Sequence, residues 1–133
     1  MNVLITPDSF KGSLSAKEVS DSIALAVKNV FPNSYIEKIP FSDGGEGAID
    51  FFRNNIKGKI VSCNTVDPLG KLINKPYYIF EEGKSVWIEL SQASGITLIE
   101  ESERNPLITS TYGTGIQIKH ALRSNCKNIF LGL

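Results

Sequence analysis

The chain has 133 residues and a formal net charge of zero, with 14 lysines and arginines balancing 14 aspartates and glutamates. Hydrophobic residues make up 41% and charged residues 21%, which is typical of a folded globular protein and argues against a disordered or membrane-spanning chain. No basic block indicates a nucleic-acid partner. The first residues lack the positive segment and long apolar run of a signal peptide, so we expect a cytoplasmic protein.

The first half of the sequence alternates between strand and helix patterns. Ser15 and Glu18 have the spacing of a capping box, and the apolar residues that follow recur at three- and four-residue intervals. The predicted elements are, in order, a strand at 2–6, a helix at 16–31, a strand at 35–39, a helix after Gly47 and a strand at 59–66. This alternation predicts an α/β fold, Rossmann-like or flavodoxin-like, with a mostly parallel sheet and flanking helices.

The pattern changes after residue 66. The residues 67–70 have the composition of a turn, and 76–80 with 85–90 predict a β-hairpin closed by 81–84. We therefore predict that a second domain begins near residue 67. This second part would continue with a helix at 115–124 and a strand at 128–133. Because that apolar strand has no turn or cap after it, we expect the natural protein to continue.

The first loop of interest, Pro7 to Ser13, follows the first strand and leads into the first helix. Asp8, Ser9 and Lys11 lie in it beside a glycine. Backbone N–H groups near a helix start favour a phosphate or carboxylate, and Lys11 adds a positive charge. The alternative is an ordinary turn with a solvated lysine.

The second loop, Ser42 to Gly47, has three glycines and two acids between a strand and a helix. Its small residues could point several N–H groups at one oxyanion, while Asp43 or Glu46 could hold Mg²⁺ or accept a proton from a substrate hydroxyl. The alternative makes Glu46 a helix-start acid and the glycines plain loop residues. Both loops follow strand ends, where open α/β sheets bind ligands.

A third segment rich in hydroxyl groups, 109–115, precedes the predicted helix and could also face phosphate, although Thr114 could equally be a helix cap. Three common motifs are missing. The sequence has no GxxxxGK[ST] run, no GxGxxG after the first strand and no GxSxG elbow. The residues alone therefore predict an anion site with acids nearby and leave the reaction open.

Taken together, the motifs resemble the bacterial two-domain, ATP-dependent glycerate kinase family. The matching segments, in sequence order, are 7–16, 42–47, 67–70, Glu89 with 93–95, 105–107 and 111–115. The family usually has alanine in place of Ser42. The resemblance implies transfer of the ATP γ-phosphoryl group to a hydroxyl of D-glycerate with Mg²⁺. It also implies that this chain is the N-terminal part of a longer protein. In that protein, residues 1–66 would be the first half of an α/β domain built from both chain ends, and residues 67–133 would begin a second, inserted α/β domain.

The resemblance also implies roles for residues in the three loops. Lys11 and the backbone of Gly44, Gly45 and Gly47 would bind phosphate or the substrate carboxylate. Asp43 and Glu46 would hold Mg²⁺ or activate the hydroxyl, and Asp8 and Ser9 would bind substrate hydroxyls. The third loop adds Thr111, Tyr112, Gly113 and Thr114 as substrate-binding residues. The alternative is a truncated α/β module that binds an anion without turnover. Oligomeric state is left open.

Overall fold

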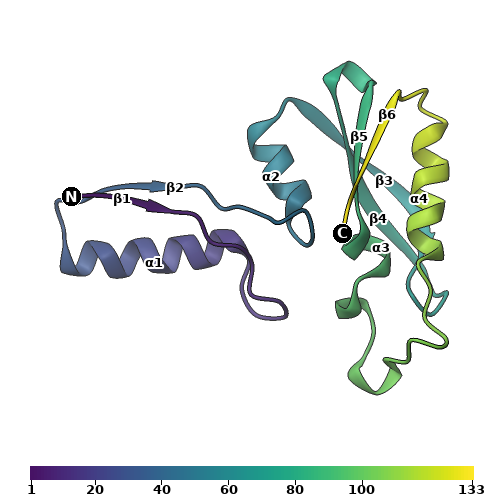
Figure 1. Ribbon diagram of the computed structural model, residues 1–133, viewed down its shortest axis with the longest axis horizontal. Coiled ribbons are helices and arrows are strands. Elements are labelled where there is room, and N and C mark those ends of the chain that lie inside the picture. The colour runs from purple at the N-terminus through teal and green to yellow at the C-terminus, as the bar shows by residue number, and fades with distance from the viewer. The chain divides into compact units, whose positions relative to one another are not determined.

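The computed structural model describes residues 1–133, which form two compact units, Met1–Asp43 and Gly44–Leu133 (Figure 1). We call these the first unit and the second unit and describe each by itself. None of the helices is both long enough and apolar enough to span a membrane.

The first unit is a βαβ arrangement. Strands β1 (Asn2–Ile5) and β2 (Tyr35–Lys38) pair in parallel, and helix α1 (Ala16–Val30) connects them and lies along them (Figure 1). The predicted capping box is present: the Glu18 N–H donates to Ser15 Oγ at 3.3 Å, and the Ser15 N–H donates to Glu18 Oε2 at 2.8 Å. The sequence pattern is thus confirmed for this segment.

Asp21 makes one ion contact within α1 and a second that links α1 to β2. Asp21 accepts hydrogen bonds from Lys17, one turn earlier at 2.7 Å, and from Lys38 of β2 at 2.5 Å. These bonds to two ammonium groups, first Lys17 and then Lys38, lower the pKa of the Asp21 carboxyl to about 2. The carboxylate therefore stays ionised well into the acid range.

The second unit is built on a four-stranded sheet in the order β3-β4-β5-β6. The strands are β3 (Gly58–Val66), β4 (Leu72–Phe80), β5 (Ser85–Glu89) and β6 (Asn128–Gly132). The first two pairings are antiparallel and β5 with β6 is parallel. The helices are α2 (Ala48–Asn55), α3 (Leu90–Ser94) and α4 (Tyr112–Leu122).

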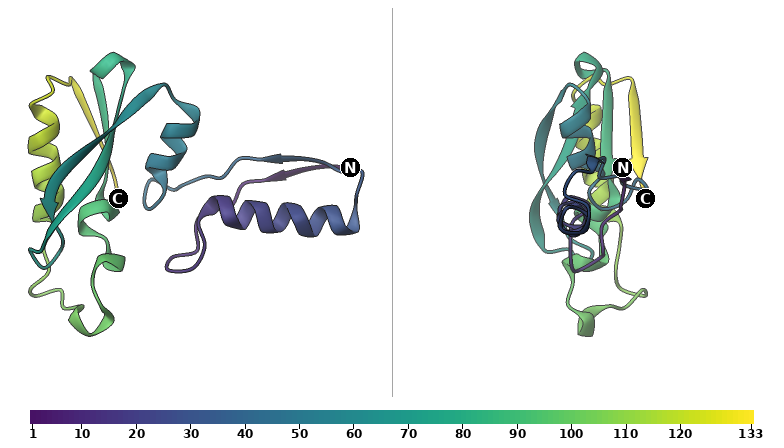
Figure 2. Two further views of the ribbon diagram at one scale, coloured as in Figure 1. Left: turned by 180° about the vertical axis from the view of Figure 1, so that it is seen from behind. Right: turned by 90° about the vertical axis from the view of Figure 1, so that its left-hand side faces the viewer.

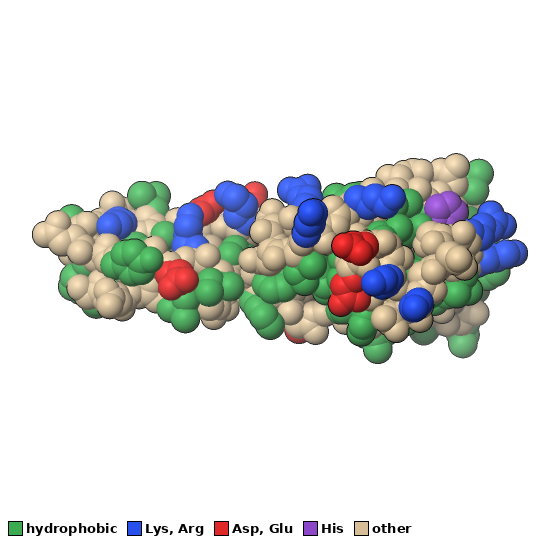
Figure 3. All heavy atoms as spheres, turned by 90° about the horizontal axis from the view of Figure 1, so that it is seen from above, with side chains coloured by type: hydrophobic (Ala, Val, Ile, Leu, Met, Phe, Trp, Pro, Cys, Tyr) green, Lys and Arg blue, Asp and Glu red, His purple; other side chains and the backbone are tan.

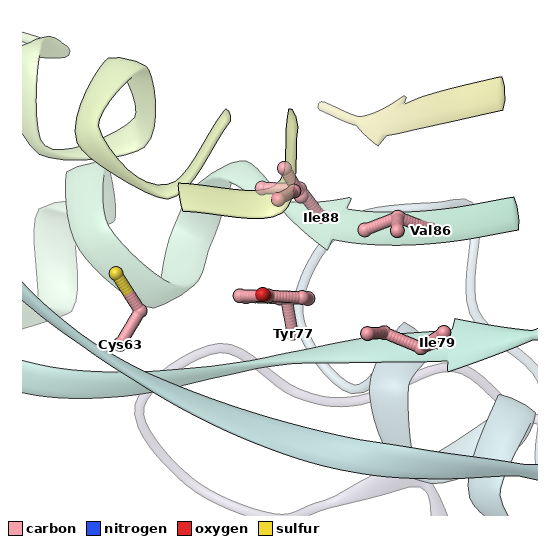
Figure 4. Packing of buried hydrophobic residues seen from close by; sticks show 6 residues of the cluster. Cys63, Tyr77, Ile79, Val86 and Ile88 are labelled. Atoms are coloured by element: carbon pink, nitrogen blue, oxygen red, sulfur yellow. The ribbon is translucent and has the colours of Figure 1, made fainter. Parts of the chain in front are cut away.

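Helices α2 and α4 cover opposite faces of this sheet (Figures 1 and 2). Side chains alternate along each strand, so Val86 and Ile88 of β5 point to the α4 side, whereas Trp87 stacks on Phe52 of α2 with ring centroids 4.7 Å apart. The hydrophobic core on the α4 side is shown in Figure 4. It contains Cys63, Tyr77, Ile79, Val86, Ile88 and Ala121.

The two cysteines are free thiols, and Cys63 is a member of this core. Burial raises the pKa of the Cys63 thiol, which keeps it protonated and unreactive. The Tyr77 hydroxyl, which also faces the α4 side, hydrogen-bonds with His120 Nδ1 at 2.9 Å. The single histidine thus has a structural partner.

The α/β class and the hairpin are confirmed, but two details differ from expectation. The strand predicted at 59–66 does not join β1 and β2, because β3 pairs with β4 over its whole length from Gly58 to Val66. The compact units divide after Asp43, and the domain boundary expected after residue 66 stays a prediction. Helix α4 also begins three residues before the predicted Gly115.

Candidate functional site

The loop after β1 is shaped by its own backbone. The Phe10 N–H donates to the Leu14 carbonyl at 2.9 Å, and the Ser13 N–H donates to the Phe10 carbonyl at 2.9 Å. The Asp8 carboxylate accepts the Ser9 N–H at 2.6 Å. Asp8 and Lys11 are exposed, so both charges can meet a ligand from solvent.

The two strand ends of the first unit lie side by side. Beyond the last paired residues of β1 and β2, the Phe41 N–H still donates to the Pro7 carbonyl at 3.0 Å. Parallel pairing therefore brings the start of the Pro7–Ser13 loop next to the segment that carries Asp43. This is the arrangement that the sequence predicted for the carboxyl edge of the sheet.

The glycine-rich loop continues into the second unit and begins α2. Gly47 is the N-cap of this helix and has φ of +90°, a left-handed conformation that glycine adopts without strain. Its N–H donates to Glu89 Oε1 at 3.1 Å, and the Ile49 N–H donates to Glu89 Oε2 at 3.0 Å. The start of α2 thus already holds an anion, the carboxylate at the end of β5.

The opposite end of this loop packs against the end of β6. A Cβ atom at Gly132 would lie 1.9 Å from the Gly44 carbonyl oxygen and 2.5 Å from Trp87 Cζ2. Only glycine permits this approach of two backbones. Between the two fixed points, the Glu46 side chain is exposed.

The hydroxyl-rich segment at the start of α4 divides into buried and exposed halves. Gly113 and Thr114 are buried: the Gly113 carbonyl accepts the Thr65 hydroxyl at 2.6 Å, and Thr114 Oγ1 shares a hydrogen bond with Ser94 Oγ at 2.6 Å. Thr111 and Tyr112 are exposed. The Thr114 hydroxyl is therefore committed to packing α3 against α4, and the exposed half is open to a ligand.

Helix α3 connects the glycine loop to this segment. At its start, Ser91 and Gln92 donate to the Glu89 carboxylate at 2.6 and 3.1 Å, and at its end Ser94 bonds Thr114. One short helix thus links two of the predicted ligand-binding segments of the second unit. The third, Pro7 to Ser13, belongs to the first unit.

No cluster of three or more His, Cys, Asp or Glu side chains that could hold a metal ion occurs in the chain. Mg²⁺ usually keeps several waters and binds one or two carboxylates together with substrate phosphates. The exposed carboxylates of Asp43 and Glu46, three residues apart, meet that requirement of donor type.

Reasoning from the residues gave no role to Glu89, Ser91, Gln92 or Gly132, which all contact the glycine loop or its partner carboxylate. One signal was present for Glu89. It ends the apolar run Val86-Trp87-Ile88, and an acid in such a run is buried only when hydrogen-bonding partners meet it. Gly132 offered no signal, because its role depends on the distant Gly44.

The chain is an α/β protein whose predicted ligand-binding loops lie next to strand ends. The family model described as "Glycerate kinase family" matches residues 3–133. The chain belongs to the glycerate kinase family.

The chain is similar to curated glycerate kinases over its whole length. It is 40% identical to a glycerate kinase from Haemophilus influenzae, 38% to one from Bacillus subtilis and 37% to a protein named glycerate 2-kinase from Escherichia coli, each over 133 residues. A crystal structure of a protein named as glycerate kinase 2 from Salmonella typhimurium LT2 matches with a TM-score of 0.68 and 36% identity, over 99% of this chain. The chain spans 35% of the length of each of these proteins.

Proposed function

We propose that this chain supplies substrate-binding loops of a glycerate kinase, which transfers the γ-phosphoryl group of ATP to a hydroxyl of D-glycerate in the cytoplasm. The observation that carries the proposal is the family match over residues 3–133. It is supported by the two loops that begin side by side at the parallel strand ends of the first unit. The domain division of the longer relatives stays a prediction.

In this proposal, charge neutralisation and positioning account for most of the catalysis, because phosphoryl transfer needs little covalent chemistry from the protein. Lys11 is the exposed cation for a phosphate or for the glycerate carboxylate. Asp8 and Ser9 bind glycerate hydroxyls, and Gly44 and Gly45 offer backbone N–H groups. Thr111, the N-cap of α4, and Tyr112, its first residue, are the exposed ligand-binding residues at this helix start.

Asp43 and Glu46 are the residues that would hold Mg²⁺. The ion, when bound, neutralises charge that develops on the phosphate oxygens. One of the two carboxylates would instead accept the proton of the attacking glycerate hydroxyl.

A second candidate is an anion-binding module without turnover. The observation that favours it is length, because the chain spans only 35% of its glycerate kinase relatives. A kinase must hold both ATP and acceptor, and part of that machinery can lie in sequence that this chain does not share.

The test is to incubate the purified chain with ATP, Mg²⁺ and D-glycerate and to follow ³¹P NMR signals. Phosphoglycerate would establish the kinase, and the signal position separates the 2-phosphate from the 3-phosphate. Lys11→Gln should abolish it, whereas Lys59→Gln, at an exposed lysine of β3, should leave it unchanged.

Titration with D-glycerate separates the remaining outcomes. Saturable shifts of the Lys11-loop amides without product would indicate the binding module. If the chain forms no product and binds no glycerate, both candidate functions are rejected for this chain.

A further inference from the structure

Glu89 is a fully buried carboxylate, with 0% of its surface exposed. Four donors surround it. Oε1 accepts from the Gly47 N–H at 3.1 Å, from Ser91 Oγ at 2.6 Å and from Gln92 Nε2 at 3.1 Å, and Oε2 accepts from the Ile49 N–H at 3.0 Å. All four donors are amides or a hydroxyl, so this charge is balanced by dipoles.

Burying an acid is costly unless its oxygens are fully hydrogen-bonded. Here two of the four donors are backbone N–H groups at the start of α2, one from the N-cap Gly47 and one from Ile49, where the helix dipole also favours a negative charge. Glu89 therefore supplies the cap that the sequence at the start of α2 lacks, since Gly47 has no side chain. A residue 42 positions away performs this role.

The same contact fixes the glycine loop. Its last residue, Gly47, is bonded to the end of β5, and its first residue in this unit, Gly44, packs on Gly132 at the end of β6. Two neighbouring strands of one sheet thus hold the loop at both ends. The residues between these points, Gly45 and Glu46, are the ones whose backbone and carboxylate the proposed function uses.

We propose that Glu89 is a positioning residue: its carboxylate occupies the start of α2 as an internal anion and thereby sets the conformation of the Gly44–Gly47 loop. The Gly47 N–H is then a structural donor, and a substrate phosphate does not sit at this helix start. That a substrate phosphate binds near this loop rests on the proposed function, whereas the internal anion does not.

The first experiment tests the internal anion in the chain itself by chemical rescue. Glu89→Ala leaves a buried space beside four donors that acetate can fill. We expect a lower melting temperature for this variant and a concentration-dependent recovery with acetate that sodium chloride of equal ionic strength does not give. Acetate should not stabilise the wild type or Glu89→Gln, whose side chains fill the space.

A loop readout keeps the test decisive if Glu89→Ala does not fold. In Glu89→Gln the side-chain amide presents N–H groups to donors, so one of the Gly47 and Ile49 amide protons should lose its acceptor and shift upfield in NMR spectra. The amide signals of Gly44 and Gly45 should move with it. Unchanged Gly44 and Gly45 signals, or equal acetate effects in the wild type and Glu89→Ala, would overturn the proposal.

The second experiment separates positioning from simple stabilisation by comparing kcat with KM below the melting range. A displaced loop should lower kcat by about tenfold or more in Glu89→Gln, since misplacement by 1 Å can cost about a hundredfold. Glu101→Gln, at an exposed acid, is the matched control and should be unchanged. Wild-type kcat and KM in Glu89→Gln would refute positioning. A wild type that neither binds nor phosphorylates glycerate would refute the proposed function, while the rescue experiment would still decide the role of Glu89.

Discussion

The two units differ in what holds them together. The second unit buries a core of strand residues against α4, whereas the first unit buries only two hydrophobic side chains, Ile5 and Val19. Hydrophobic side chains show on the surface of the first unit in the view of Figure 3. Its exposed large hydrophobic residues include Leu4, Ile23, Leu25, Val30, Phe31 and Tyr35. Local signals thus define the first unit, and contacts between distant residues define the second.

The largest expected effect tests this difference directly. Ile88→Ala removes a side chain with no exposed surface and should lower the free energy of unfolding by about 2 to 5 kcal/mol. Leu25→Ala in α1, where the side chain is 65% exposed, should change it by less than about 0.5 kcal/mol. Urea denaturation of both variants measures the two values. Equal losses would show that the first unit has a core of its own.

A pair of glycines in α4 sharpens the description of the second unit. A Cβ at Gly113 would lie 1.9 Å from the Val66 carbonyl oxygen, whereas one at Gly115 meets nothing within 4 Å. We expect Gly113→Ala to destabilise by about 1 to 3 kcal/mol through overpacking. Gly115→Ala should stabilise by up to about 1 kcal/mol through helix propensity. Thermal melting compares them, and a tolerated Gly113→Ala would contradict the close packing of α4 on β3.

Local patterns predicted the first unit well. The capping box at Ser15 and the apolar spacing after it specify α1, and its neighbours in sequence pair with each other. The same reasoning failed for β3, because the residues 58–66 look equally suited to either sheet. They pair with β4 instead, in which Tyr77 packs in the core on the α4 side and Tyr78 packs against Phe52 of α2 on the other face. A strand's pattern predicts its existence but not its neighbour.

The candidate site shows the same limit. Loop position and composition predicted Lys11, Asp43 and the glycines as site residues, since strand ends gather at one edge of a parallel sheet. They could not show that Gly47 donates to Glu89, because that bond joins residues far apart in sequence. The burial of the Thr114 hydroxyl could not be predicted either, because it depends on a hydrogen bond with Ser94, 20 residues earlier.

A smaller effect is expected from the cap of α1. Ser15→Ala removes the acceptor of the Glu18 N–H and should destabilise the helix by about 1 kcal/mol. Hydrogen exchange should speed up at the first α1 amides and stay unchanged in β4 and β5. The control is Ser22→Ala, which removes a hydroxyl that donates to the Glu18 carbonyl inside the same helix. This change should lower the stability little. Faster exchange in β4 and β5 as well would contradict the local character of the first unit.

The smallest effect is a pH dependence confined to the first unit. Because the pKa of Asp21 is lowered from 3.8 to about 2, the stabilisation from its ionised form is complete above pH 3.8 and is lost as the pH falls through about 2. Carboxyl ¹³C shifts should give Asp21 a midpoint of about 2. Lys38→Ala should raise that pKa by removing one of the two ammonium partners, and Lys59→Ala in β3 should not move it. A wild-type midpoint near 3.8 would mean that neither lysine holds Asp21 in solution and that α1 and β2 are joined by packing alone.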